Sequence, residues 1–201
     1  MRREHRKYTP ITCIIGTGTQ YINTLYKFTN NTNKHRFVMK YAKTGTSINN
    51  ATHIFGSSTS SGTLWFNAYT NSNNSYSTQC YMGSTGQILW IADYTLAINI
   101  IDFTLQNNTT ILKVNGTTTT PNYSSTIVSN ADIFLFASSK GTNVSAGKSR
   151  MKLYYCQIYE NDILIRDFIP ILDYNKVPCL YDRVSQAYYY NAGTGTFNYE
   201  I

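Results

Sequence analysis

Sugar recognition is the first chemistry that the residue types suggest, because aromatic rings and side-chain amides alternate along residues 65–76. Aromatic rings stack on the C–H faces of sugars, and amides form hydrogen bonds with their hydroxyls. On a strand, Trp65, Asn67 and Tyr69 point to the same side. The alternative is that Trp65 packs in the core, as large aromatic side chains usually do. The candidate carbohydrate-binding residues are Trp65, Asn67, Tyr69, Asn71, Asn74 and Tyr76.

Groups suited to catalysis are scarce. Glycoside hydrolysis needs two carboxylates roughly 5–10 Å apart, and close pairs such as Glu160 and Asp162 lie at a predicted turn, where solvent surrounds both. Neither His35 nor His53 is near a Cys or Ser in a recognisable nucleophile motif, and we interpret both as strand-surface residues. The sequence therefore predicts a protein that is not an enzyme. Pairing of distant carboxylates leaves a glycan-degrading enzyme as a third hypothesis.

No metal and no cofactor are predicted. The loop 71–75 offers Asn but no Asp for calcium. The cysteines are scattered without a C-x-x-C pair, so we expect buried free thiols. The glycine-rich stretch 191–197 precedes no predicted helix whose N-terminus could hold a phosphate, and we interpret it as a turn. The four cysteines are Cys13, Cys80, Cys156 and Cys179.

Three consecutive tyrosines precede that glycine-rich turn. On a strand Tyr188 and Tyr190 face one side and Tyr189 faces the other. The triplet by itself therefore cannot form a single sugar platform. We interpret it as part of the last strand pair of the fold.

Positive charge is concentrated at the start of the chain. The formal net charge is +7, and residues 1–43 hold nine Lys or Arg against one acid. Residues 1–11 form a predicted basic arm, which is either a solvated start or an anchor that orders on an acidic partner or nucleic acid. The absence of a base-reading motif argues against sequence-specific nucleic-acid recognition. The candidate docking residues are Arg2, Arg3, Arg6 and Lys7.

Short strands separated by turns are predicted for the rest of the chain. Apolar and polar residues alternate in many segments, and Asn115-Gly116 and Asn161-Asp162 predict tight hairpin turns. Residues 163–172 are a predicted return strand, ended by Pro170 and Pro178. No apolar run approaches the roughly 20 residues of a membrane span, and the short apolar run near the start predicts no secretory signal. The pattern indicates an all-β sandwich.

The last third resembles concanavalin A-like (laminin-G-type) lectin/glucanase-fold domains, which are common in bacteriophage and prophage proteins. The resemblance covers about residues 16–197 and is specific over 133–197. This chain departs from the family pattern at Ser185-Gln186-Ala187, where an Asn-Gly turn is more usual. The matching pieces are "GTQYINT", "ILKVNG", "IFLFA", "KLYYCQIYENDILIRDFIP", "LYDRV" and "NAGTGTF".

The resemblance implies a jelly-roll β-sandwich of two antiparallel sheets over residues 12–201, behind the arm of residues 1–11. It also implies a non-enzymatic virion protein, made in the bacterial cytoplasm, that decorates a capsid or tail and contacts other virion proteins partly through the arm. The alternative is a carbohydrate-binding module for host surface glycans or mucus. The resemblance supplies no catalytic residues.

Overall fold

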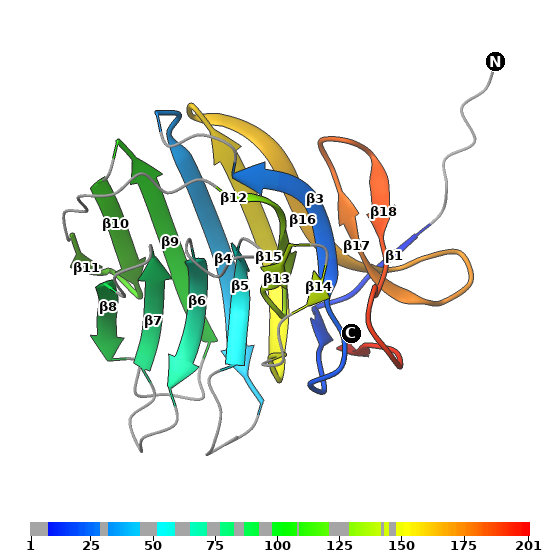
Figure 1. Ribbon diagram of the computed structural model, residues 1–201. Helices are drawn as coiled ribbons and strands as arrows, with labels where there is room; N and C mark the ends of the chain where they lie inside the picture. Colours follow the sequence, from blue (N-terminus) through cyan, green and yellow to red (C-terminus); the bar gives the residue numbers. More distant parts are fainter. Residues whose placement is uncertain are drawn as a thin grey trace.

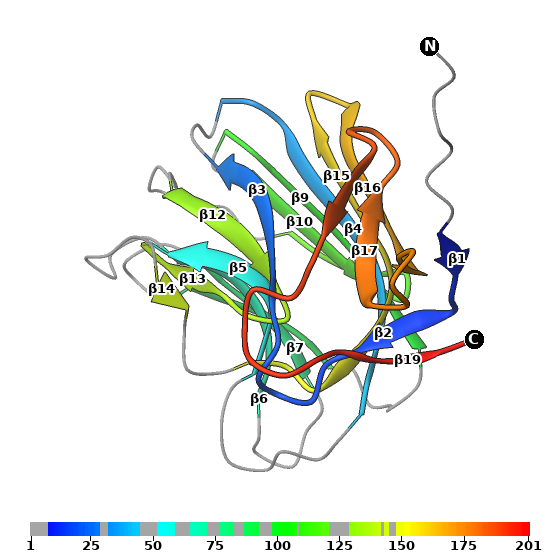
Figure 2. The same cartoon turned by 90° about the vertical axis from the view of Figure 1, so that its right-hand side faces the viewer.

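A computed structural model describes residues 8–28, 32–44, 52–58, 65–71, 77–82, 87–92, 98–107, 109–120, 129–141, 143–144 and 148–201, with the backbone only for residue 52 and for 65–71, 77–82 and 87–92. These residues form strands joined by turns, arranged in two layers (Figures 1 and 2). No helix in the described part of the chain is long and apolar enough to cross a membrane. The predicted all-β sandwich of two sheets is confirmed.

The larger sheet has eleven strands among the described residues. They are β1 Thr9–Pro10, β2 Cys13–Ile15, β4 His35–Lys43, β9 Ile98–Gln106, β10 Thr109–Val114, β11 Thr117–Thr119, β15 Met151–Glu160, β16 Ile163–Leu172, β17 Pro178–Asp182, β18 Ala187–Tyr189 and β19 Asn198–Glu200. Their main order is β11–β10–β9–β4–β15–β16–β17–β18. In addition, β1 pairs with β16, β2 pairs with β15, and β19 pairs with β2. The sheet is antiparallel.

The smaller sheet covers one face of the larger sheet. Its described strands are β3 Ile22–Phe28, β5 Thr52–Ser58, β6 Trp65–Asn71, β7 Ser77–Met82, β8 Gln87–Ala92, β12 Ser129–Leu135, β13 Ser139–Lys140 and β14 Asn143–Val144. Their order is β14–β13–β5–β6–β7–β8, and β12 joins β5 to β3. The β13–β5 pair is parallel, whereas the other pairs are antiparallel.

The hydrophobic core lies between the two sheets. Phe37 of β4 stacks on Phe55 of β5 with ring centroids 5.4 Å apart, so the contact joins the sheets directly. Both rings are fully buried, while Arg36 and Val38 on either side of Phe37 are partly exposed. Because successive side chains of a strand alternate between its faces, each strand of the larger sheet also presents a row of side chains outward.

The predicted hairpin turns are confirmed. Asn115-Gly116 joins β10 to β11, with φ values of 51° and 87°, and Asn161-Asp162 joins β15 to β16, with φ values of 50° and 65°. Two consecutive left-handed residues match the right-handed twist of the flanking strands.

The interpretation of His35 as a strand-surface residue was wrong. His35 is fully buried, and its Nδ1 lies 2.5 Å from the hydroxyl of Tyr26. The ring of Phe28 packs 4.2 Å from the imidazole, centroid to centroid. A hydrogen-bond partner and an aromatic neighbour allow the imidazole to occupy the core, whereas the sequence indicated a strand surface.

The start of the chain fills a gap where β15 and β16 separate. Beyond Phe168, β16 no longer pairs with β15 and instead pairs with β1, the last part of the predicted arm, while β2 pairs with β15. The predicted return strand over residues 163–172 is confirmed, and β16 passes through Pro170 to Leu172. The carbonyl of Pro170 accepts a hydrogen bond from the N–H of Ile11. The nitrogen of Pro170 points to the same side of β16, where the sheet needs no N–H donor from this residue.

Candidate functional site

Four tyrosines form a continuous row on the outer surface near β17 and β18, which we call the tyrosine ladder. Its members are Tyr8, Tyr181, Tyr188 and Tyr190. Consecutive ring centroids lie 4.9, 5.3 and 6.3 Å apart, and the last two rings are nearly parallel. The side chain of Tyr190 is 44% exposed and the other three are partly buried. The rings therefore offer aromatic surface to solvent while packing on one another.

Strand alternation and register place the ladder. Tyr181 and Tyr188 are direct partners in the β17–β18 pair, as are Leu180 and Tyr189 on the inner face. Tyr189 is buried and meets Phe168 edge-on at 4.9 Å. The predicted division of the triplet between two sides is thus confirmed. Tyr188 and Tyr190 join Tyr181 of the neighbouring strand and Tyr8 from the start of the chain to make the platform that the triplet alone cannot form.

Asp173 holds the end of the ladder in place. The hydroxyl of Tyr190 donates to Asp173 Oδ2 at 2.9 Å. Burial raises the pKa of Tyr190, and the hydrogen bond to the Asp173 carboxylate raises it further. The phenol is consequently neutral at physiological pH, and its ring is fixed before any ligand arrives, which lowers the entropy cost of binding.

A charged network meets the other end of the ladder beside Tyr8. Arg183 Nε donates to Asp167 Oδ2 at 2.7 Å, and Gln157 Nε2 donates to Oδ1 at 3.2 Å. The hydrogen bond with Asp167 raises the pKa of Arg183, and the nearby Tyr8 adds to this. The Asp167 side chain is buried whereas that of Arg183 is 55% exposed. The buried carboxylate therefore orients a guanidinium whose outer edge faces solvent.

Polar contacts continue across the outer face of the larger sheet. Tyr159 donates its hydroxyl to Gln157 Oε1 at 3.0 Å, and the guanidinium of Arg36 lies 5.4 Å from the centre of the Tyr159 ring. Arg36 also forms two 2.8 Å hydrogen bonds to Asp102. We call the ladder together with these residues the outer band. It crosses the sheet from β9 to β18 through β4, β15, β16 and β17.

The glycine-rich turn after the ladder is occupied by structural contacts. Asn191 Oδ1 accepts hydrogen bonds from the backbone N–H groups of Tyr21 at 3.1 Å and Gly193 at 2.8 Å. A Cβ on Gly193 would lie only 2.2 Å from the carbonyl oxygen of Thr19, so the close approach of the two loops requires glycine. Phe197 is buried against Phe136. The turn joins the chain's end to its beginning, in keeping with the sequence-based interpretation.

The residues predicted from sequence for carbohydrate binding lie elsewhere. Trp65, Asn67 and Tyr69 belong to β6 of the smaller sheet and pair with β5. Their side-chain positions, and Asn74 and Tyr76 altogether, lie outside the description, so this patch stays a prediction. The docking residues Arg2, Arg3, Arg6 and Lys7 lie outside the described residues too.

Sequence reasoning missed the ladder because its members come from separate segments. Tyr8 is in the predicted arm, and Tyr181 precedes a turn that separates it from Tyr188. The available indication was the alternation in 180–182, where Tyr181 stands between residues that face the core. Among the described residues, no group of three or more His, Cys, Asp or Glu could hold a metal ion.

Comparison with known proteins identifies the fold. No protein-family model and no curated protein matches this sequence. Several solved structures match over most of the chain with TM-scores above 0.5. Three of them are the CBM40 of the Ruminococcus gnavus IT-sialidase (TM-score 0.56, 16% identity, covering 79% of this chain and 91% of that one), a heptameric SAP-like pentraxin of Limulus polyphemus (0.52, 9%, 78% and 76%) and domains LG4–5 of the mouse laminin α1 chain (0.54, 10%, 80% and 44%).

These similarities establish a concanavalin A-like sandwich for this chain, and at such low identity they establish the fold alone. The same CBM40 has also been solved bound to α2,3-sialyllactose, again with 16% identity to this chain. None of the three proteins is a phage protein. The phage part of the sequence resemblance therefore stays a prediction.

Proposed function

We propose that this protein is a non-catalytic glycan-binding module and that the outer band is its binding surface. The observation that carries the proposal is the tyrosine ladder ending at Arg183. Tyrosine rings stack on the apolar faces of pyranose rings, and a guanidinium donates paired hydrogen bonds to neighbouring hydroxyls or carboxylates. A row of rings spaced 4.9 to 6.3 Å apart suits several consecutive sugar units of a chain.

The state of the carboxylates in the band favours binding over hydrolysis. Asp167 accepts hydrogen bonds from Arg183 and Gln157, and Asp102 accepts two from Arg36. A general acid must present its carboxyl group to the glycosidic oxygen, whereas the oxygens of these two carboxylates are occupied by guanidinium and amide donors. Both groups are suited to orienting arginines.

The structural neighbours support the same proposal. The CBM40 whose fold this chain shares is a carbohydrate-binding module, and it has been solved with a bound sialylated sugar. The predicted virion role rests on the sequence resemblance alone. The two proposals are compatible, since a particle protein could attach the particle to glycans.

The first prediction concerns the ladder. Replacing Tyr188 or Tyr190 by Ala should weaken binding of the best ligand found on a glycan array by about tenfold, because losing one stacking contact costs on the order of 1.4 kcal/mol. Isothermal titration calorimetry with that ligand measures the change. Tyr154→Ala is the matched control, since Tyr154 is a partly buried tyrosine of β15 that packs near Lys40 and lies outside the ladder.

Thermal unfolding of each variant separates loss of the site from loss of the fold. Equal affinity in the ladder variants and the wild type would contradict the proposal, and so would an array without any bound glycan at high protein concentration. If Trp65→Ala weakens binding while the ladder variants do not, the patch on β6 is the site instead.

A further inference from the structure

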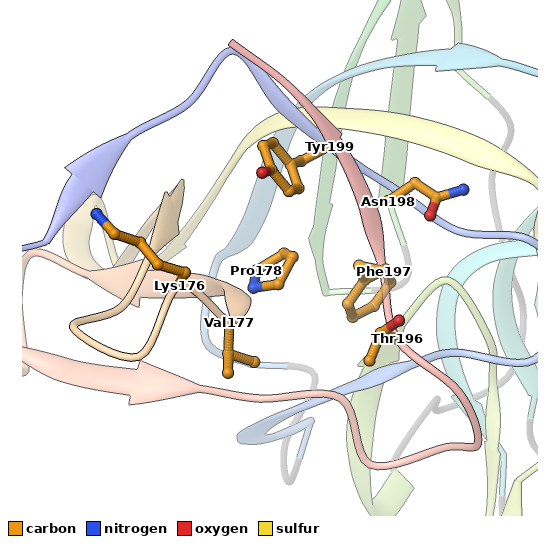
Figure 3. A pocket seen from close by; sticks show the side chains of 7 residues that line it. All are labelled: Lys176, Val177, Pro178, Thr196, Phe197, Asn198 and Tyr199. Atoms are coloured by element: carbon orange, nitrogen blue, oxygen red, sulfur yellow. The ribbon is translucent and has the colours of Figure 1, made fainter.

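A pocket of about 540 Å³ lies on the other side of the turn that anchors the ladder (Figure 3). It is open to solvent and is bounded by the connection between β16 and β17 on one side and by the last strand, β19, on the other. Small-molecule sites usually have volumes of roughly 300–1,000 Å³, so one sugar unit can enter. The lining residues are Lys176, Val177, Pro178, Thr196, Phe197, Asn198 and Tyr199.

The floor and one wall of the pocket are apolar. Phe197 is 3% exposed, and Pro178 lies beside it (Figure 3). Tyr199, which is 41% exposed, points to the same side of the strand as Phe197, while Asn198 points to the other side (Figure 3). This alternation gives the pocket a surface that can contact the C–H face of a sugar.

The polar groups at the mouth of the pocket are a cation and a hydroxyl. Lys176 and the hydroxyl of Tyr199 lie at the same side of the opening (Figure 3). The seven lining residues include one cation and no acid. An ammonium above an apolar floor attracts an anion, and the local charge would repel a second cation.

Hydrogen bonds to Asp173 hold the backbone turn that carries Lys176. Asp173 Oδ1 accepts hydrogen bonds from the N–H groups of Asn175 and Val177, each at 2.8 Å, and the Lys176 N–H donates to the Asp173 carbonyl at 3.0 Å. Asp173 is itself buried and held by Tyr190. Because this carboxylate is engaged by the turn and by Tyr190, the Lys176 ammonium is left to serve a ligand.

We propose that this pocket binds a sugar unit that carries a carboxylate. The C–H face of the sugar packs on Phe197 and Pro178, and the carboxylate accepts hydrogen bonds from the Lys176 ammonium and the Tyr199 hydroxyl. The pocket is a second site that goes beyond the proposed function of the outer band, because none of its lining residues belongs to the tyrosine ladder.

The test compares acids with their own neutral esters. The methyl glycosides of glucuronic acid and N-acetylneuraminic acid are titrated into isotope-labelled protein, each beside its methyl ester, and binding is followed by NMR. At least one acid should bind about fivefold more tightly than its ester, since a hydrogen-bonded ion pair at a partly exposed site contributes on the order of 1 kcal/mol. The amide signals of 176, 177 and 196–199 should shift.

Matched variants separate the local ammonium from the overall positive charge. Lys176→Gln should remove the preference for the acid, Lys176→Arg should retain it, and Lys113→Gln, which removes the charge of an exposed lysine on β10, should leave it unchanged. Equal affinity for acid and ester, a preference that survives Lys176→Gln, or the absence of shifts at these amides would overturn the proposal.

The ladder variants distinguish the two sites. Tyr188→Ala should leave the preference for the acid intact. If it abolishes that preference, the carboxylate is bound near Arg183 and the pocket is not the site. Conversely, acid binding at the pocket without any effect of the ladder variants on glycan binding would contradict the proposed function and leave this inference standing.

Discussion

Burial alone changes the chemistry of His53 on β5. Its sequence surroundings indicated a strand-surface residue, whereas in the structure the residue is partly buried. Burial lowers the pKa of His53 from 6.5 to about 4, because the charged imidazolium loses hydration. In the unfolded chain the same histidine binds a proton near pH 6.5. The unfolded state therefore holds more protons between these two values.

This difference predicts a dependence of stability on pH. The contribution of neutral His53 is complete above about pH 6.5 and is lost as the pH falls toward 4, by about 2 kcal/mol between pH 6.5 and 4.5. Urea unfolding at pH 7.0, 5.5 and 4.5 measures it. The variant His53→Gln lacks this titration and should lose less stability over the same range. Parallel profiles for the two proteins would contradict the assignment.

At the scale of an element, Asp182 organises the connection between β17 and β18. Its fully buried carboxylate accepts hydrogen bonds from the N–H of Asp167 at 2.8 Å, from the N–H of Val184 at 3.1 Å and from the hydroxyl of Ser185 at 2.6 Å. Gln186 has a φ of 57°, the left-handed conformation that an Asn or Gly adopts more easily. The connection tolerates the unusual Ser185-Gln186-Ala187 sequence because Asp182 holds it.

Replacing Asp182 by Asn should therefore destabilise the protein by about 2 kcal/mol, since four hydrogen bonds and the 3.7 Å contact with Arg166 lose the charge of the carboxylate and one acceptor oxygen is lost. Chemical denaturation measures the loss. Asp162→Asn is the matched control, because Asp162 is 68% exposed in its ion pair with Lys34 and should change stability by less than about 0.5 kcal/mol. Similar losses in both variants would show that Asp182 has no special role in the connection.

At the scale of the whole molecule, the two ends of the described chain meet in one sheet. β2 pairs with β15 on one side and with β19 on the other (Figure 2). Cys13 of β2 is buried, and its thiol lies 3.5 Å from Glu200. Burial, and then the nearby Glu200 charge, raise the pKa of Cys13 to about 11. The thiol is thus protected by the last strand.

Removing residues 198–201 should expose this thiol. Cys13 should then react with an alkylating reagent at least tenfold faster, because exposure returns its pKa toward the ordinary value and increases the thiolate fraction. Mass spectrometry of individual cysteines measures the rates. The buried free thiols Cys156 and Cys179 serve as internal controls and should remain slow. Labelling of all three together would indicate global unfolding, and unchanged Cys13 would contradict the protection by β19.

Local patterns were sufficient for the class of fold. The alternation in 151–160, the Asn115-Gly116 and Asn161-Asp162 turns and the closing Asn191–Phe197 stretch all act through neighbouring residues, so they can be recognised without the structure. The burial of His35 and the pairing of β16 with β1 could not be recognised in this way. Both depend on partners, Tyr26 for His35 and the first strand for β16, that only the assembled sheets bring into place.

The sequence by itself thus determined an all-β sandwich and the opposite orientation of Tyr189 relative to Tyr188 and Tyr190. The tertiary structure alone decided which aromatic and charged side chains become neighbours. Tyr8 reaches Tyr181 because β1 fills the gap beside β16, and Tyr199 lies near Lys176 because β19 returns to pair with β2. The physical reason is that strand periodicity sets the face of each side chain, whereas strand order and register set its neighbours across the sheet.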